Sequence, residues 1–440
     1  MKIVLVSGNR ERQGFPPLGI LYLSSYILKY SSDTVIKVFD CIPTLSEITS
    51  ESPDIVGISS LSLHYTDVCL FIKDLRSHFG GPIILGGAHV TLEKKLPDFF
   101  DIAVLGEGES TFLNLVNLFK ADGKFTPQNL KNIDGIMYRN SNGTLCINPS
   151  SGFIQDLDSI PFPARELIDM NDYLKPNNIF GTRVGRGTTL LSSRGCAYKC
   201  DYCSISNIWA RPRYHSASYV ADEISHLISL YGIELLYFCD DNFCSNLPRL
   251  RLLADEIESR NIKIDIGIMG RVDFFNDEIS NLYKRIGITS ISLGIETGSS
   301  RMLKLLKHGN NLSIEKITDT VNRIHNSGFE LSACLMIGSP TETEDDMLQT
   351  LNLASKLPFS KIHTYISLPF IGTKWWDIAI EQGIVPNNPD WDYWKVYDIR
   401  NVLDERPIFT NTVSRSKLIE LSEKFKKLQQ EKFYFEWKNS

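Results

Sequence analysis

Three cysteines within eight consecutive residues limit what this chain can fold into more than any other feature. Cys196, Cys200 and Cys203 follow the spacing C-x3-C-x2-C, and the loop that joins them is too short to let the sulfurs face apart. An iron-sulfur cluster takes thiolate ligands of this kind. Because a cubane cluster has one iron for each of four ligands, three cysteines would leave one iron open to a small molecule, as a catalytic zinc keeps an open position.

Two less specific interpretations of these cysteines remain. A structural zinc knuckle is disfavoured because no fourth ligand sits at finger-like spacing. Cysteines can also pack as small buried hydrophobes. Arg194, Lys199 and Asp201 make the loop too polar for a core segment, which favours the metal site.

The stretch from Ser192 to Cys203 resembles the cluster motif of the radical S-adenosylmethionine (SAM) superfamily, with Tyr202 at the aromatic position before the third cysteine. The resemblance implies a [4Fe-4S] cluster whose unique iron is chelated by the amino and carboxylate groups of SAM. It also implies reductive cleavage of SAM to a 5'-deoxyadenosyl radical. The electron would come from a donor such as flavodoxin or ferredoxin.

Composition sets the broad class of the chain. Its 440 residues suggest two or three domains, and 42% hydrophobic with 22% charged residues is usual for a soluble globular protein. A net charge of -6 argues against a broad nucleic-acid-binding surface, which needs clustered positive charge. The sequence has no apolar run long enough to span a bilayer, no signal peptide and no disulfide framework among its nine cysteines, so we expect a cytoplasmic protein.

Residues 1–150 are expected to form a doubly wound α/β domain. Short runs of Val, Ile and Leu predict strands buried on both faces of a parallel sheet, at residues 3–6, 36–39, 55–58, 83–85 and 102–105. Helical spacing between them predicts helices at 19–30, 66–79 and 110–119. Residues 131–150, with a turn at Asn142-Gly143, read as an appended hairpin. Ligands of such sheets bind beyond the carboxyl ends of the strands.

The loops at those strand ends are rich in glycine, which lets a backbone approach a ligand closely. Together with the wording of Pro16–Leu23, Asp54–Ser59 and Leu85–Thr91, they resemble the cobalamin-binding domain found ahead of many radical SAM domains, over most of residues 1–125. The resemblance implies that cobalamin contacts Ser7, Gly8, Asn9, Ser59, Ser60, Leu61, Gly86, Gly87, Gly106, Glu107 and Gly108.

One departure from that resemblance concerns the cobalt ligand. Cobalamin domains of the methionine synthase type carry Asp-x-His-x-x-Gly after the first strand, whereas residues 7–14 here contain no histidine. The domain is therefore expected either to bind cobalamin without a histidine below the cobalt or not to bind it. His89 is interpreted as a turn residue and not as a ligand.

After a proline-bearing linker at 151–185, the alternation of strands and helices resumes over residues 186–370. Candidate strands lie at 188–191, 235–238, 264–268, 290–293, 331–337 and 362–367, and they predict a partial (β/α)6 barrel. In such barrels the chemistry collects at the carboxyl ends of the strands. The cluster loop follows the first strand and therefore lies on that rim.

The residues that follow the later strands are candidates for binding SAM. By resemblance, Asp240 and Asp241 match the motif that contacts the SAM ammonium, Arg271 and Glu296 lie around its carboxylate and ribose, and Gly338 forms the turn against which adenine packs. Two alternatives stay open: residues 240–242 could be a simple Asx-rich turn, and Arg271 could pair with Glu296 on the rim. Cys239 and Cys244 are interpreted as packing residues.

Residues 371–440 are expected to form a small C-terminal extension. Five of the six tryptophans fall there, and they are interpreted as covering an open barrel edge in preference to lining a substrate pocket. Residues 414–437 have the pattern of an amphipathic helix.

The sequence therefore predicts a cobalamin-dependent radical SAM enzyme, most simply a methyltransferase for an unactivated carbon or phosphorus centre of a small molecule or peptide. Cofactors of this kind carry the chemistry, so no catalytic side chain is assigned. A radical cyclase or rearranging enzyme, and a non-enzymatic iron-sulfur redox sensor, are the alternatives. A methylthiotransferase is disfavoured because the N-terminal cysteines Cys41, Cys69 and Cys146 are too scattered for a second cluster.

Overall fold

The fold is taken from a computed structural model that describes residues 1–150, 152–175, 183–243, 246–307, 312–386, 389–391 and 408–437, the last without side chains from 433 onward. The chain divides into two compact units. The first comprises Met1–Tyr173 with Asp390–Lys395, and the second comprises Leu174–Pro389 with Val396–Ser440. Residues 152–173, which fall in the expected linker, are thus counted with the first unit, as is a short piece of the C-terminal extension.

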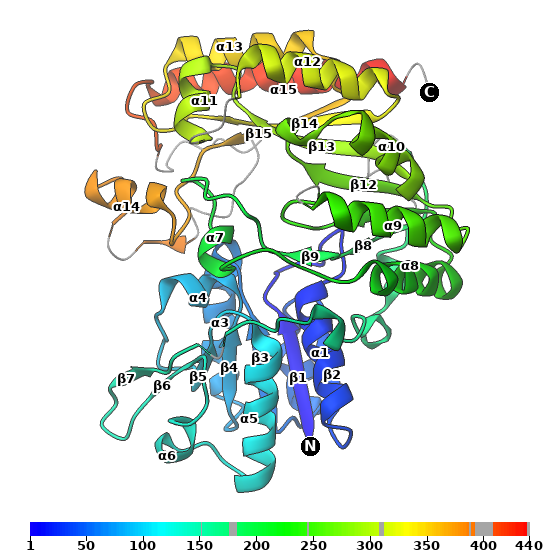
Figure 1. The fold of residues 1–440 in the computed structure, drawn as a ribbon. Helices are drawn as coiled ribbons and strands as arrows, with labels where there is room; N and C mark the ends of the chain where they lie inside the picture. The colour runs from blue at the N-terminus through cyan, green and yellow to red at the C-terminus, as the bar shows by residue number, and fades with distance from the viewer. Residues whose placement is uncertain are drawn as a thin grey trace. The chain divides into compact units, whose positions relative to one another are not determined.

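The described residues of the first unit form a seven-stranded sheet in the order β2-β1-β3-β4-β5-β6-β7 (Figure 1). The parallel strands are β1 (Lys2–Ser7), β2 (Val35–Phe39), β3 (Ile55–Ser59), β4 (Ile83–Gly86) and β5 (Ile102–Val104). The hairpin strands β6 (Ile136–Arg139) and β7 (Leu145–Ile147) extend it in antiparallel pairing. The doubly wound α/β fold expected from the alternating pattern is confirmed.

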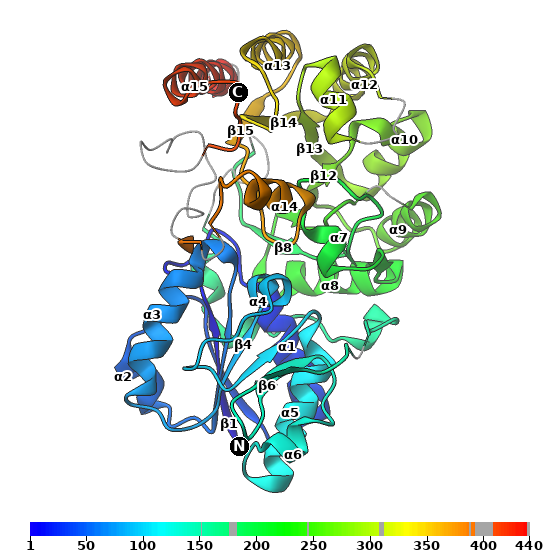
Figure 2. The same cartoon turned by 90° about the vertical axis from the view of Figure 1, so that its left-hand side faces the viewer.

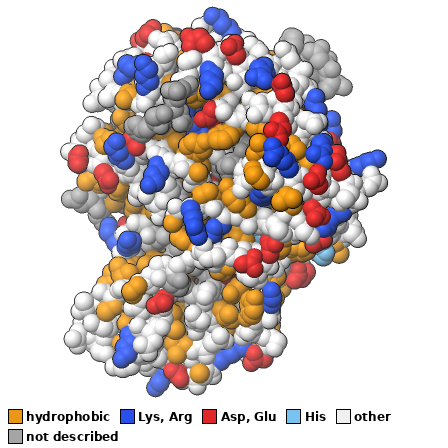
Figure 3. Space-filling model, in the orientation of Figure 1, with side chains coloured by type: hydrophobic (Ala, Val, Ile, Leu, Met, Phe, Trp, Pro, Cys, Tyr) orange, Lys and Arg blue, Asp and Glu red, His pale blue; other side chains and the backbone are white. Residues whose placement is uncertain are grey.

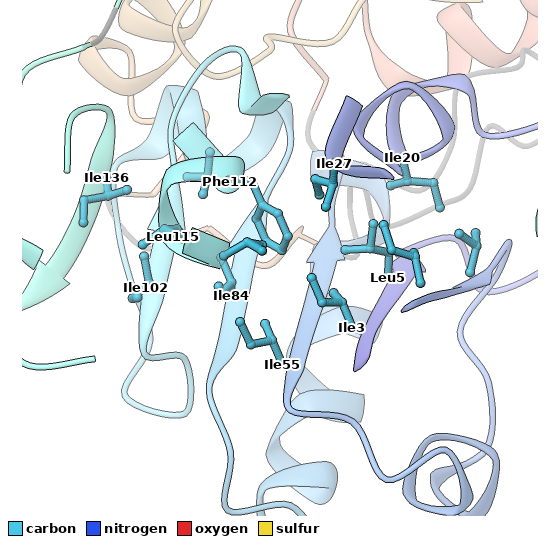
Figure 4. Packing of buried hydrophobic residues seen from close by; sticks show 14 of the residues in the cluster. Ile3, Leu5, Ile20, Ile27, Ile55, Ile84, Ile102, Phe112, Leu115 and Ile136 are labelled. Carbon is cyan, nitrogen blue, oxygen red and sulfur yellow. The ribbon is translucent and has the colours of Figure 1, made fainter. Parts of the chain in front are cut away.

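Helices cover both faces of this sheet. Figure 2 shows α1 (Leu18–Tyr30) and α5 (Gly108–Asp122) on one face and α2 (Leu45–Ser50) and α3 (Tyr65–Arg76) on the other. Short helices α4 (Ala88–Glu93) and α6 (Pro127–Leu130) and 3-10 turns at Ser62–His64, Leu157–Ser159, Arg165–Leu167 and Met170–Asp172 complete the unit. In the core, Phe112 and Leu115 of α5 pack with Ile84 and Ile102 of the sheet (Figure 4).

The strand order of the first unit fixes where a ligand can bind. The chain moves outward from β1 to β2 and then returns to the other side of β1 to form β3, so the order reverses between β1 and β3. In doubly wound sheets, ligands bind in the crevice outside the carboxyl ends of the strands at such a switch point. Here those ends are Ser7 of β1 and Ser59 of β3, with Gly86 of β4 beside them.

The described residues of the second unit form a sheet of six parallel strands in sequential order, which is the arrangement of a partial barrel (Figure 1). The strands are β8 (Gly187–Leu190), β11 (Leu235–Phe238), β12 (Asp265–Gly270), β13 (Ile288–Glu296), β14 (Glu330–Ile337) and β15 (Lys361–Ile366). Between them lie α8 (Ala217–Tyr231), α9 (Leu247–Ser259), α10 (Asp277–Ile286), α11 (Ser300–Leu306), α12 (Ile314–Asn326) and α13 (Glu344–Lys356). The expected partial barrel is confirmed.

The two faces of the barrel sheet differ, as alternation along a strand requires. On β14, Leu331, Ala333, Leu335 and Ile337 are buried, whereas the residues between them are only half-buried. The buried residues pack against the helices, and the half-buried ones line the inner face of the barrel. Smaller elements of the unit are a ribbon of β9 (Ser193–Arg194) and β10 (Arg213–Tyr214), α7 (Ile205–Ile208), a 3-10 turn at Val272–Phe274 and α14 (Lys374–Glu381).

The C-terminal helix α15 (Arg415–Trp437) confirms the expected amphipathic helix. It packs on α13 and β15 and buries Leu418, Leu421 and Phe425 (Figures 1 and 2). Trp394 and Cys244 lie outside the described residues. No described helix is long and apolar enough to cross a membrane. On the face drawn in Figure 3, acidic and basic side chains are interspersed.

Candidate functional site

The three cysteines lie on a loop that leaves the carboxyl end of the first barrel strand. After β8 the chain forms β9, which pairs with β10 on the far side of the cysteine loop, and Gly195 directly after β9 turns the chain toward Cys196 with a positive φ of 93°. A Cβ on Gly195 would lie 2.9 Å from the Arg211 carbonyl oxygen and 3.0 Å from the Trp209 Cβ. Only glycine fits both this φ and this approach, so the turn requires a glycine before Cys196.

The thiols of this loop are close enough to influence one another. Burial raises the pKa of Cys203 to about 11, and the charges of Cys200 and Cys196 add to that shift. Burial likewise raises the pKa of the Cys196 thiol, with the Cys200 charge again adding to the shift. Neighbouring thiolates in a poorly solvated loop need a compensating cation, which a metal cluster provides.

This donor set fits a cluster better than a single ion. Among the described residues no three Cys, His, Asp or Glu side chains are gathered closely enough to hold one metal ion. Each cysteine of a cubane binds a different iron, so its ligands stand farther apart than the ligands of one zinc. Three thiols on one short loop, close enough to act on one another, fit the ligand set of a cluster.

Asp240, two residues after β11, holds the start of the loop by hydrogen bonds. Its Oδ1 accepts hydrogen bonds from the Ser192 and Ser193 amides at 2.7 and 3.2 Å, and its Oδ2 accepts from the two serine hydroxyls at 2.5 and 2.6 Å. The residue is 2% exposed. These bonds direct the carboxylate toward the loop backbone, which differs from the contact with a SAM ammonium expected from the sequence.

A buried arginine holds the other side of the same peptide. Arg249 of α9 donates from Nη2 to the Ser192 carbonyl oxygen at 3.0 Å. Burial lowers the pKa of Arg249, and the nearby charge of Asp240 opposes that shift. Sequence reasoning missed this residue, although an arginine beside Leu250 and Leu253 on the buried stripe of an amphipathic helix is a detectable signal.

Asp241 and Asp240 point to different partners. Asp241 accepts a hydrogen bond from the Gly195 amide at 2.9 Å and so holds the turn that precedes Cys196. Burial raises the pKa of Asp241, the Gly195 amide opposes the shift, and the charge of Asp240 adds to it. The two adjacent carboxylates thus fix two successive parts of the cluster loop.

Glu296 sits at a strained point at the end of β13. Its φ is 69°, and the pairing of β13 with β14 is interrupted by a bulge between Gly294 and Glu296. Strain of this kind in a non-glycine residue is typical of functional sites. Burial raises the pKa of Glu296, and the charge of Lys307 and the hydroxyl of Tyr202 oppose that shift. In the sequence Tyr202 lies between two of the cluster cysteines.

Lys307, just beyond α11, is the second residue that sequence reasoning missed. It is 4% exposed, and its Nζ donates to the Gly294 carbonyl oxygen at the bulge. Burial lowers the pKa of Lys307, while the charge of Glu296 opposes the shift. The ammonium group therefore supports both the bulged backbone and the buried carboxylate. The Tyr202 ring also contacts Trp375 of α14 at 5.5 Å between centroids.

Arg271 is paired with Asp273 in the structure. Its Nε and Nη2 form a fork with both oxygens of Asp273, at 2.9 and 2.7 Å. Its guanidinium carbon lies 3.8 Å from the centroid of the Tyr198 ring. The proposed rim pair between Arg271 and Glu296 is therefore wrong, because the partner of Arg271 is Asp273.

The turn after β14 carries Gly338 and an unusual carboxylate. Gly338 has a φ of 77°, and Thr341 shortly after it has a φ of 63°. The Oε2 of Glu342 accepts from the Ser339 amide at 2.8 Å, whereas its buried Oε1 has no hydrogen-bond partner among the described residues. Burial raises the pKa of Glu342 to about 7.

At the carboxyl edge of the first unit, two of the glycines expected to contact cobalamin allow neighbouring loops to approach each other closely. A Cβ on Gly8 would lie 2.4 Å from the Ser59 carbonyl oxygen, and one on Gly87 would lie 2.5 Å from that of Ser60. A Cβ on Gly106 would meet nothing within 4 Å, and one on Gly86 would meet only a carbonyl oxygen at 4.0 Å.

Of the other residues expected to contact cobalamin, some bond to neighbouring protein groups and one is exposed. Asn9 donates to the Ser7 hydroxyl, the Ser60 hydroxyl donates to the Leu61 carbonyl, and the Glu107 carboxylate accepts from the Ile154 amide. The Leu61 side chain is 48% exposed. Leu61 is an exposed apolar side chain, and Cβ positions at Gly86 and Gly106 would have no atom closer than 4.0 Å, so this edge offers open surface onto which the large flat ring of a corrinoid fits.

His89 is held inside the first unit. Its side chain is fully buried, with Nδ1 bonded to the Ser62 hydroxyl at 2.9 Å and Nε2 to the Glu93 carboxylate at 2.8 Å. The rings of Tyr65 and Trp391 lie 3.7 and 4.5 Å from the imidazole. Both ring nitrogens are therefore occupied, and His89 lies in helix α4 and not in the turn expected from the sequence.

Comparison with known proteins gives two family matches. Residues 190–354 match the model of the radical SAM superfamily, and residues 12–116 match that of the B12-binding domain. An uncharacterised methyltransferase of Pyrococcus horikoshii is 30% identical over 84% of this chain and 80% of its own. The anaerobic magnesium-protoporphyrin IX monomethyl ester cyclase of a Synechocystis species is 27% identical over 88% of this chain and 78% of its own.

A solved structure shares the fold of both units. The radical SAM methyltransferase TsrM of Kitasatospora setae, with tryptophan and a SAM analogue bound, superposes with a TM-score of 0.71 at 18% identity. The match covers 88% of this chain and 77% of that one.

Proposed function

Because this chain belongs to the radical SAM superfamily and carries a B12-binding domain, we propose that it is a cobalamin-dependent radical SAM methyltransferase. Its target would be an unactivated carbon or phosphorus centre of a small molecule or peptide. The observation that carries the proposal is the support given to the cysteine loop: Asp240 and Arg249 hold its backbone, and Asp241 holds the Gly195 amide ahead of Cys196.

Cys196, Cys200 and Cys203 would hold the [4Fe-4S] cluster. When bound, the cluster and cobalamin supply the reductive cleavage of SAM and the carriage of its methyl group, which the side chains of a protein do not provide. The chain itself contributes position. Asp240 fixes the two serine peptides ahead of Gly195, and Asp241 fixes Gly195, so the first cysteine starts from a defined backbone.

Glu296 is the residue best placed to bind SAM. A carboxylate accepts hydrogen bonds from a ribose diol, and the raised pKa that burial gives Glu296 is opposed by Lys307 and Tyr202. These two groups favour the ionised form of the carboxyl, which accepts hydrogen bonds. We assign the SAM ammonium to the vicinity of Asp241 and the adenine to the turn at Gly338. We assign the SAM carboxylate to the Nη1 of Arg271, because the fork to Asp273 uses only Nε and Nη2.

The inner face of the barrel sheet is the proposed substrate site. Tyr365 of β15 is 36% exposed and Met269 of β12 is 40% exposed, although both lie on strands of the sheet. His363 is in register with Cys334 on the adjacent strand and faces the same side as Tyr365. Exposed aromatic and thioether side chains on an otherwise packed sheet can contact an organic substrate.

In the first unit, cobalamin would lie against Leu61, Gly86 and Gly106 beyond the carboxyl ends of the strands. His89 would have to break two hydrogen bonds and leave a fully buried site to reach cobalt. We therefore propose that this chain binds cobalamin without a histidine ligand from this edge. The electron would come from a small donor protein such as flavodoxin or ferredoxin.

The second candidate is a radical cyclase, and the similarity to the Synechocystis cyclase favours it. Turnover of candidate substrates with methyl-labelled SAM under anaerobic conditions separates the two functions. Label in the substrate product supports methyl transfer. Formation of 5'-deoxyadenosine with a modified but unlabelled product would exclude methyl transfer and support the cyclase.

A further inference from the structure

The cluster loop has the fixed positive charge of Arg271 beside it, and the proposed function uses only the Nη1 of that guanidinium. Tyr198 lies midway between Cys196 and Cys200, and its ring is covered by the guanidinium of Arg271, at 3.8 Å from the ring centroid. A guanidinium at that distance from an aromatic face makes a cation-π contact. The Nε–Nη2 edge of the guanidinium is fixed by the fork to Asp273, at 2.9 and 2.7 Å.

This arrangement is partly shielded from water. The side chains of Arg271 and Asp273 are 12% and 14% exposed. Charges in such positions are screened by salt much less than exposed charges are. Because two contacts hold the guanidinium, its charge stays at one place relative to the loop.

The charge lies against the loop that carries the cysteines. The guanidinium rests on the ring of Tyr198, which is two residues from Cys196 and two from Cys200. Asp273 carries the opposite charge next to it and partly cancels its field.

We propose that Arg271, held in place by Asp273 and by the ring of Tyr198, sets the reduction potential of the cluster bound by this loop. The inference rests on the cluster assignment of the proposed function. Reduction adds one electron, supplied by an external low-potential reductant, and breaks no bond. A nearby positive charge stabilises the more negative reduced cluster, so Arg271 raises the potential and Asp273 lowers it.

The test is a redox titration followed by electron paramagnetic resonance, on the full-length protein reconstituted anaerobically and without SAM. In the absence of SAM, a contact between Arg271 and the SAM carboxylate cannot contribute to the result. The probe is dithionite with redox mediators. Iron and sulfide content and circular dichroism confirm that each variant holds a cluster and is folded.

Opposite shifts are expected from the two members of the fork. Arg271→Gln should lower the potential, and Asp273→Asn, which leaves the guanidinium uncompensated, should raise it. Each shift should correspond to about a tenfold change in the one-electron equilibrium constant, about 59 mV. Tyr198→Phe keeps the ring and should match the wild type, whereas Tyr198→Leu removes the ring and should lower the potential. Arg271→Lys should restore part of the loss seen in Arg271→Gln.

A role in holding the loop alone would give a different pattern. If Arg271→Gln and Asp273→Asn shift the potential in the same direction, or if neither shifts it, the inference is overturned. If Arg271→Gln does not retain a cluster, Asp273→Asn and Arg271→Lys decide the matter: a higher potential in the first and a near wild-type value in the second support the inference. A wild-type protein that reconstitutes no cluster would refute the proposed function as well.

Discussion

Glu342 should make the protein less stable as pH rises from acid to neutral. The carboxyl is buried after β14, and one of its oxygens has no hydrogen-bond partner among the described residues. Burial raises its pKa from 4.5 to about 7. Between these two values the folded protein holds a proton that the unfolded chain has released, so the free energy of unfolding falls with increasing pH. The loss is complete above about pH 7.

The size of the effect follows from the same two values. The difference between about 7 and 4.5, at 1.36 kcal/mol for each pKa unit, gives about 3 kcal/mol at neutral pH. Glu342→Gln replaces the carboxyl with an amide of the same shape that does not ionise. The amide oxygen can still accept from the Ser339 amide.

The assay is urea unfolding of the wild type and Glu342→Gln at several values between pH 4 and 8, compared as the difference between the two proteins. The variant should gain about 3 kcal/mol over the wild type between about pH 4.5 and 7. Glu344→Gln, at a side chain that is 44% exposed, is the matched control and should leave the pH dependence of the wild type in place. A difference between wild type and Glu342→Gln that does not change with pH would refute the reasoning.

Three further variants test the support of the cluster loop. Asp240→Ala leaves four buried donors of the loop without their acceptor and should cost about 3–5 kcal/mol in unfolding free energy and lower the iron bound on reconstitution. Gly195→Ala should reduce iron binding far more than Gly232→Ala, because both have a positive φ but only Gly195 has a carbonyl oxygen within 2.9 Å of the new Cβ. Lys307→Met should weaken SAM binding about tenfold or more in equilibrium dialysis, because Glu296 loses its buried counter-charge. Lys307→Arg should recover part of that binding, and unchanged binding in Lys307→Met would contradict the role of Lys307.

The elements that the sequence predicts well are those in which one physical cause dominates. The continuous apolar runs of the first unit become β1, β3 and β4, because strands covered on both faces must be apolar throughout. The cysteine spacing and the barrel alternation are equally direct. Helix α2 was not expected, although Thr44 and Glu47 form a capping box that marks its start.

The site residues are harder to predict because their roles depend on side-chain direction. Successive residues of a strand point to opposite faces. Asp240 therefore continues the buried side of Phe238, and Asp241 continues the side of the half-buried Tyr237. That alternation can be read from the sequence alone, and it separates the two aspartates. Lys307 offers no such signal. Its contact with the Gly294 carbonyl oxygen depends on the course of the chain after α11, which no local pattern in the sequence indicates.

The fate of SAM tests most directly the proposal that this chain cleaves SAM at a cluster held by its three loop cysteines. Protein reconstituted anaerobically with iron and sulfide is mixed with SAM and dithionite, and 5'-deoxyadenosine is measured by chromatography. We expect the wild type to form 5'-deoxyadenosine and Cys203→Ser, which removes one cluster ligand, to form none. A wild-type protein that carries a full cluster and leaves SAM intact, or equal 5'-deoxyadenosine formation by Cys203→Ser, would contradict that proposal.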